Sequence, residues 1–204
     1  LTFATGVVDA ISYVALDKVF TGNMTGNVPL IGFSVGCVEE LPLVTNLVAL
    51  GGFVLGSVIA CRGVPSAKVA VLPRPALSAL IGCAVLIALV AVTWVIIGTE
   101  NPAVELVMTG TLAVAMGAQV NAVKPLGNTD ISTIVVTNTL ANLARDSKLG
   151  GGGGQAWGQR LSAALCLGSG AATGVFILDW LGGAAAVTLA AVLIAAVVVV
   201  LWRA

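Results

Sequence analysis

Apolar segments of roughly 20 residues recur along this chain, and they restrict its possible folds more than any other feature. The bilayer core is about 30 Å thick and is crossed by roughly 20 helical residues, so each segment predicts a transmembrane helix. A sixth candidate, 1–20, contains the acidic residue Asp9. The sequence therefore predicts an all-α, polytopic membrane protein with about six transmembrane helices. The five clearest segments are 45–61, 76–98, 104–123, 161–178 and 184–202.

The composition agrees with this class and narrows the partners. Only 9% of the residues are charged and 58% are hydrophobic, whereas soluble domains carry about 25% charged residues. Nine basic and nine acidic residues balance, so we expect no nucleic-acid partner. The expected partners are the lipid bilayer and a small polar or ionic solute. A Gly/Ala-rich helix face is also compatible with a homodimer.

No pattern typical of an enzyme is present. Histidine, the commonest general base and metal ligand, is absent. The sequence contains no nucleotide-binding GxxxxGK[ST] motif, no serine elbow and no cluster with metal-ligand spacing. We therefore predict no enzymatic activity, no cofactor and no metal site.

Basic residues gather in two connectors, 62–75 and 146–160, and near the C-terminus at Arg203. The positive-inside rule predicts that these parts are cytoplasmic. Helix 45–61 would then run towards the cytoplasm and helix 161–178 away from it. The two halves would have opposite orientations.

The halves also align. A gapless shift of 112 residues places Asn121 on Asp9 and Thr137 on Thr25. If the halves are inverted, each half must cross the membrane an odd number of times, and three spans per half meet this condition. We therefore expect two inverted repeats, each with a short broken or re-entrant helix in addition to its three spans. The first repeat covers 1–98, with spans at about 1–20, 45–61 and 76–98 and a broken element at 21–38. The second covers 104–204, with spans at about 104–123, 161–178 and 184–202 and a broken element at 126–144.

Small residues recur every fourth position in two of the expected helices. Such spacing allows helix backbones to approach closely. The glycines expected to pack helices together are Gly52, Gly56, Gly168, Gly170 and Gly174.

Asp9 is the clearest candidate for a functional residue. A carboxylate inside the membrane is costly and usually faces a cavity or a partner. Helical spacing places Thr5, Asp9 and Ser12 on one face, and we expect Thr5, Ser12, Tyr13 and Gln119 to line a pathway beside Asp9. The alternative is structural: Asp9 caps a broken helix or accepts hydrogen bonds from the following loop.

The polar stretch TGNMTGN (21–27) follows this helix. Its amide and hydroxyl groups can hold a polar solute or a cation, or they can simply satisfy one another. We expect a substrate or ion site that combines both halves. Its candidate residues are Asp9, Asn23, Thr25, Asn27, Asn121, Thr137 and Asn138.

The stretch TGVVDAISYVALDKVFTGNMTGNVPLIG (5–32) resembles the signature of the YoaK-type family of bacterial multi-pass membrane proteins, a family of unknown function. The resemblance covers the whole chain and implies five to seven spans. A second family signature resembles TGTL, and this chain has Thr137-Asn138-Thr139-Leu140 in its place. The resemblance implies no substrate.

Together these features favour a small secondary transporter or permease of the bacterial inner membrane that is coupled to protons or a cation through Asp9. Two alternatives stay open. One is a passive channel on the same scaffold, and the other is a non-transporting membrane scaffold or partner protein.

Overall fold

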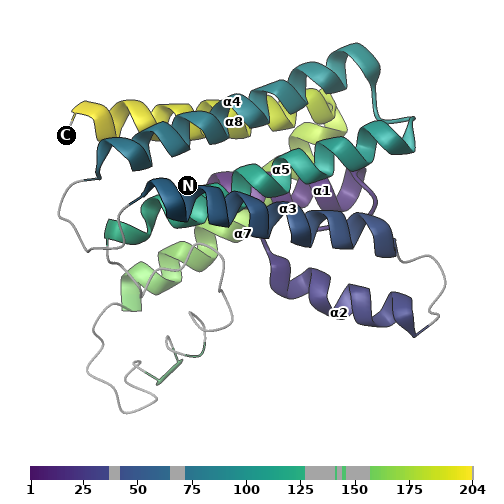
Figure 1. The fold of residues 1–204 in the computed structure, drawn as a ribbon, viewed down its shortest axis with the longest axis horizontal. Helices are drawn as coiled ribbons and strands as arrows, with labels where there is room; N and C mark the ends of the chain where they lie inside the picture. Colours follow the sequence, from purple (N-terminus) through teal and green to yellow (C-terminus); the bar gives the residue numbers. More distant parts are fainter. Residues whose placement is uncertain (37–41, 65–71, 127–140, 142–143, 146–156, 204) are drawn as a thin grey trace.

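A computed structural model describes residues 1–36, 42–64, 72–126, 141, 144–145 and 157–203. The expected broken element 126–144 lies almost entirely outside the described residues, and so do Thr137 and Asn138. The regular secondary structure of the described residues is entirely helical (Figure 1). The α-helices are α1 (Thr2–Ala15), α2 (Met24–Val35), α3 (Leu43–Gly63), α4 (Arg74–Ile97), α5 (Pro102–Val123), α7 (Trp157–Leu181) and α8 (Gly183–Arg203), and η1 (Lys124–Leu126) is a short 3₁₀ helix.

Five of these helices, α3, α4, α5, α7 and α8, are long and apolar enough to cross a membrane. Large apolar side chains on their outer faces are exposed, for example Val95 at 74%, Ile96 at 75% and Phe176 at 67%. Such surfaces are unfavourable in water and fit a lipid environment. The predicted all-α, polytopic membrane class is confirmed.

The first two helices are shorter. α1 has 14 residues and α2 has 12, and at about 1.5 Å per residue neither reaches across a core about 30 Å thick. The non-helical connection 16–23 separates them and contains the first part of TGNMTGN. The described residues of the segments 1–20 and 21–38 thus form two short helices around a break.

The helices pack in pairs (Figure 1). α3 lies parallel to α5, and α1 lies parallel to α7, because contacting positions rise together along both members of each pair. α4 and α8 are antiparallel, since Gly183 at the start of α8 contacts Trp94 near the end of α4. α1 and α5 occupy the centre, where Ile11, Leu112 and Ile194 are fully buried.

Glycines set the spacing in both parallel pairs. A Cβ at Gly56 would clash with the Val114 carbonyl oxygen, and one at Gly117 with that of Phe53. Equivalent clashes would occur between α1 and α7, at Gly170 with Phe3 and at Gly6 with Leu167. Backbones this close require residues without side chains.

Of the glycines expected to pack helices, Gly52, Gly56, Gly170 and Gly174 do contact a neighbouring helix backbone. The prediction is wrong for Gly168, because a Cβ there would meet no described atom within 4 Å. The α7 contact is made two residues later, at Gly170, so Gly168 lies on another face of the helix.

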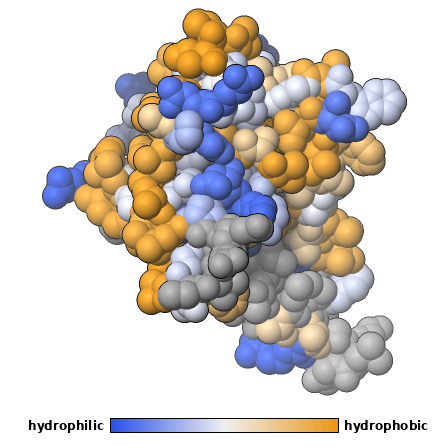
Figure 2. All heavy atoms as spheres, turned by 90° about the vertical axis from the view of Figure 1, so that its right-hand side faces the viewer, coloured by the Kyte–Doolittle hydropathy of each residue, from blue (hydrophilic) through white to orange (hydrophobic). Residues whose placement is uncertain are grey.

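Several arginines and several acidic residues lie at opposite ends of the bundle. Arg62, Arg74 and Arg203 lie at the end where α3 finishes, α4 begins and α8 finishes, at the left of Figure 1. Glu100 and Asp179 lie at the opposite end. Figure 2 views that opposite end, where hydrophilic side chains form a band between hydrophobic flanks.

Candidate functional site

Asp9 holds the break between α1 and α2 together. Its Oδ1 accepts hydrogen bonds from the backbone N–H groups of Thr21 at 3.1 Å, Gly22 at 2.7 Å and Asn23 at 3.4 Å. These N–H groups belong to non-helical backbone and would otherwise lack partners inside the membrane. Asp9 therefore has the structural role that the sequence analysis gave as the alternative: its carboxylate accepts hydrogen bonds from the following loop.

The second carboxylate oxygen of Asp9 makes no hydrogen bond to a described residue. Asp9 is only 6% exposed, and it contributes to the wall of a pocket of about 290 Å³ between α1, the connection 16–23 and α7. The other walls include Tyr13, Phe20 and Asn23. One carboxylate oxygen of Asp9 is therefore fixed by hydrogen bonds from the loop, and the residue also lines a pocket.

Glycine is required at position 22 beside the carboxylate. A Cβ there would lie 2.9 Å from Thr5 Cγ2 and 3.2 Å from Asp9 Oδ1. Both distances are shorter than ordinary van der Waals contact, so a side chain would push the loop away from Asp9. Gly22 thus permits the shortest of the three hydrogen bonds.

Asn27 joins the start of α2 to the same connection. Its Oδ1 accepts the N–H of Phe20 at 2.9 Å, and its Nδ2 donates to the Phe20 carbonyl at 2.6 Å. The side chain is fully buried. Asn27 satisfies both backbone groups of one loop residue, which is a local structural role.

Replacing Asn27 with alanine should lower the free energy of unfolding by about 2–4 kcal/mol, because both backbone groups of Phe20 lose their partners at about 1–3 kcal/mol each and are only partly buried. Reversible unfolding in mixed micelles measures the change. Thr25→Ala is the matched control: Thr25 is exposed and donates only to Asn23 Oδ1 at 2.6 Å, so its loss should change stability by less than about 0.5 kcal/mol. Equal losses in the two variants would contradict this assignment for Asn27.

The expected pathway residues divide into enclosed and accessible groups. Thr5 and Ser12 are buried. The Ser12 hydroxyl donates to the Asp9 carbonyl at 3.1 Å and accepts from Thr21 Oγ1 at 3.4 Å. Tyr13 is 41% exposed, and its ring stacks on Phe20 at 4.8 Å between centroids.

The two candidates on α5 point in different directions. Gln119 Nε2 donates to Thr5 Oγ1 at 3.1 Å, which links α5 to α1, while its buried Oε1 has no partner among the described residues. Asn121 instead accepts from Cys61 Sγ at 3.3 Å and donates to the Gly117 carbonyl at 3.1 Å. The described contacts thus bring Gln119, and not Asn121, to the helix that carries Asp9.

A second polar group lies where the connection 16–23 meets α3, and no sequence pattern singled it out. Asp17 Oδ2 accepts from Thr45 Oγ1 at 2.7 Å. Asp17 and Lys18 both have φ of 53°, a left-handed conformation that is rare outside glycine and costs about 1–3 kcal/mol. The only sequence signal was the polar pair itself at the end of an apolar helix.

Comparisons with known proteins agree with this architecture. Residues 1–200 match the model of the family described as "Protein of unknown function (DUF1275)". The UPF0700 transmembrane protein YoaK of Bacillus subtilis (strain 168) is 34% identical over 147 residues. That stretch is 72% of this chain and 64% of the relative, so the match spans less than two thirds of the relative's length. No solved structure matches.

The family match runs from α1 into α8 and includes both Asp9 and the TGNMTGN segment. The chain belongs to the DUF1275 family of proteins of unknown function, and it is similar to the transmembrane protein YoaK.

Proposed function

We propose that this protein is a small secondary transporter of the bacterial cell membrane, with the broken element α1–α2 as its working part. The observation that carries the proposal is the position of Asp9. One carboxylate oxygen holds the non-helical connection 16–23, and the residue lines the adjoining pocket. Secondary transporters place their solute and coupling-ion sites at such broken helices.

Two inverted repeats are the second part of the proposal, and helix directions support it. α1 is parallel to α7, and α7 is antiparallel to α8. α4 is antiparallel both to α8 and to α5. α1 and α5 therefore run in opposite directions, and so do α3 and α7. Superposing α1, α3 and α4 on α5, α7 and α8 would reverse every helix, as inverted repeats require.

The glycine contacts support the same correspondence and refine its register. The Gly56–Val114 contact matches Gly170–Phe3, and the Gly117–Phe53 contact matches Gly6–Leu167. With these matches, α1 corresponds to α5 with a shift of 111 residues, and α3 corresponds to α7 with a shift of 114 residues. The gapless shift of 112 is off by one and two residues, so Asp9 has Val120 as its counterpart in place of Asn121.

Orientation follows from the charges at the two ends. Arg62, Arg74 and Arg203 share one end of the bundle, and basic residues in short connectors stay cytoplasmic. The C-terminus is therefore assigned to the cytoplasm. The pocket of about 290 Å³ suits a small solute, and Asp9 supplies a group that can carry a proton or pair with a cation.

The test is transport in proteoliposomes with a panel of small polar solutes and monovalent ions, with and without an imposed pH gradient. Wild-type protein should accumulate at least one solute uphill, only when the gradient is present. Asp9→Asn should fold and lose the accumulation. Downhill flux that ignores the gradient would indicate a channel, and identical behaviour of both proteins would contradict any role of Asp9 in coupling.

A further inference from the structure

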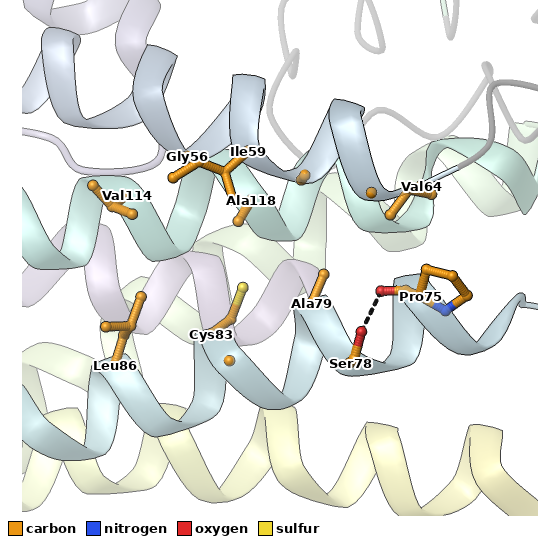
Figure 3. Close-up of a pocket in the computed structure, with 13 residues that line it drawn as sticks. Gly56, Ile59, Val64, Pro75, Ser78, Ala79, Cys83, Leu86, Val114 and Ala118 are labelled. Carbon is orange, nitrogen blue, oxygen red and sulfur yellow. Dashed lines mark hydrogen bonds between the residues drawn. The ribbon is translucent and has the colours of Figure 1, made fainter.

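A second cavity, of about 330 Å³, lies between α3, α4 and α5, away from Asp9. Figure 3 shows its walls: Gly56, Ile59 and Val114 on one side face Ala79, Cys83 and Leu86 on the other. It extends as a groove along α4 from Leu86 towards Pro75, at the basic end of the bundle. α3 and α4 follow one another in the chain but pack mainly on α5 and α8, which leaves the groove between them.

Small residues keep this groove empty of protein atoms. Gly63 on α3 and Gly82 on α4 both line it, and a Cβ at either position would meet nothing within 4 Å among the described atoms. Ala60 and Ala118 contribute only methyl groups. The groove therefore has room for a chain of carbon atoms along the helices.

The lining offers almost nothing to a polar ligand. Ser78 is its only hydroxyl-bearing residue, and Ser78 Oγ already donates to the Pro75 carbonyl at 2.8 Å. The neighbouring outer surface is apolar as well, with Ile59 58% exposed and Ile81 43% exposed. Both bordering helices are long and apolar enough to cross a membrane, so we expect lipid hydrocarbon to meet the groove.

Two arginines mark the basic end of the groove. Arg62 directly precedes Gly63, and Arg74 directly precedes Pro75; both arginines are exposed. Guanidinium groups at the membrane interface recognise phosphate oxygens through paired hydrogen bonds and charge. We propose that the groove between α3 and α4 is a binding site for an anionic phospholipid, whose acyl chain lies along Gly82 and whose phosphate is held by Arg62 and Arg74.

Charge complementarity distinguishes this occupant from a second copy of the chain. An interface between two copies would bring two pairs of arginines close together, which is unfavourable. An anionic headgroup instead places negative charge at Arg62 and Arg74, while its chain fills the apolar part of the groove. Basic positions near a membrane surface attract anionic lipid with about 1 kcal/mol each.

The experiment uses the full chain in phosphatidylcholine vesicles doped with photoactivatable phosphatidylglycerol or, in a parallel arm, photoactivatable phosphatidylcholine. The reactive group is in the acyl chain, and labelled peptides are identified by mass spectrometry. Labelling should concentrate on peptides from α3 and α4 that line the groove, and phosphatidylglycerol should label them more strongly than phosphatidylcholine.

Two kinds of variant test the two halves of the site. Gly82→Leu fills open space and replaces a glycine inside a helix, so the variant should fold and lose the groove labelling. Gly168→Leu changes another glycine that faces open space, and it should leave the labelling intact.

Arg62→Gln and Arg74→Gln should each weaken the preference for phosphatidylglycerol roughly fivefold. Arg203→Gln, at the same end of the bundle, is the matched control.

Equal labelling by both lipids would overturn the proposal, as would labelling spread evenly over all spans. A groove occupied by a second copy would also overturn it. In that case Gly82→Leu would convert a dimer into a monomer, and phosphatidylglycerol would not label the groove in the wild type. None of these outcomes depends on solute transport.

Discussion

Replacement of Asp9 with alanine is expected to lower the free energy of unfolding by roughly 3 kcal/mol or more. Oδ1 accepts the N–H groups of Thr21, Gly22 and Asn23, and each donor left without an acceptor costs about 1–3 kcal/mol. Loss of the carboxylate also removes the only side chain seen to fasten Gly22 and Asn23 to α1 among the described residues. Reversible unfolding in mixed micelles measures the change.

The isosteric change Asp9→Asn separates the structural role from the charge. Asparagine keeps an oxygen that can accept from Gly22, although hydrogen bonds to a neutral acceptor are about half as strong as those to a carboxylate. We therefore expect Asp9→Asn to lose clearly less stability than Asp9→Ala. If solute accumulation is lost in Asp9→Asn while the protein remains folded, the charge serves transport and not only the fold.

Asp179→Asn is the matched control for both measurements. Asp179 is an exposed acid near the end of α7, so its substitution should change stability by less than about 0.5 kcal/mol. A loss in Asp9→Ala no larger than the loss in this control would contradict the assignment of Asp9 as the anchor of the connection 16–23.

Much of the fold could be predicted because the dominant signal is local. A run of about 20 apolar residues defines a span by length alone, and the five clearest runs correspond to α3, α4, α5, α7 and α8. The end of α1 at Ala15 could not be read in the same way. The polar pair Asp17 and Lys18 is followed by two more apolar residues, Val19 and Phe20, and the break depends on hydrogen bonds from Thr21 and Gly22 back to Asp9.

The sequence was enough to predict the central residues of the candidate site, but not the partners that these residues contact. Asp9 and the polar stretch 21–27 stand out because ionisable and helix-breaking residues are rare in spans. Which partner each residue meets depends on packing. Gln119 and Asn121 are two residues apart and so about 200° apart around a helix; only the position of α1 decides that Gln119 reaches Thr5.

The last prediction concerns the close contact between α3 and α5. Gly56→Ala would place a methyl group against the Val114 carbonyl oxygen, a backbone atom that cannot move aside without its helix. Overpacking of this kind costs about 1–3 kcal/mol. At Gly168 the same substitution meets open space and should stabilise the helix by up to about 1 kcal/mol. The two variants should therefore differ by about 1–4 kcal/mol in unfolding free energy.

The comparison extends to α7 and tests the register of the proposed second repeat. A gapless shift of 112 residues makes Gly168 the counterpart of Gly56, whereas the backbone contacts make Gly170 the counterpart, because its Cβ would meet the Phe3 carbonyl oxygen. Gly170→Ala should therefore destabilise the protein about as much as Gly56→Ala, and Gly168→Ala should not. If Gly168→Ala were the damaging variant, α7 would face α1 with another side, and the correspondence between the two halves would return to the simpler shift.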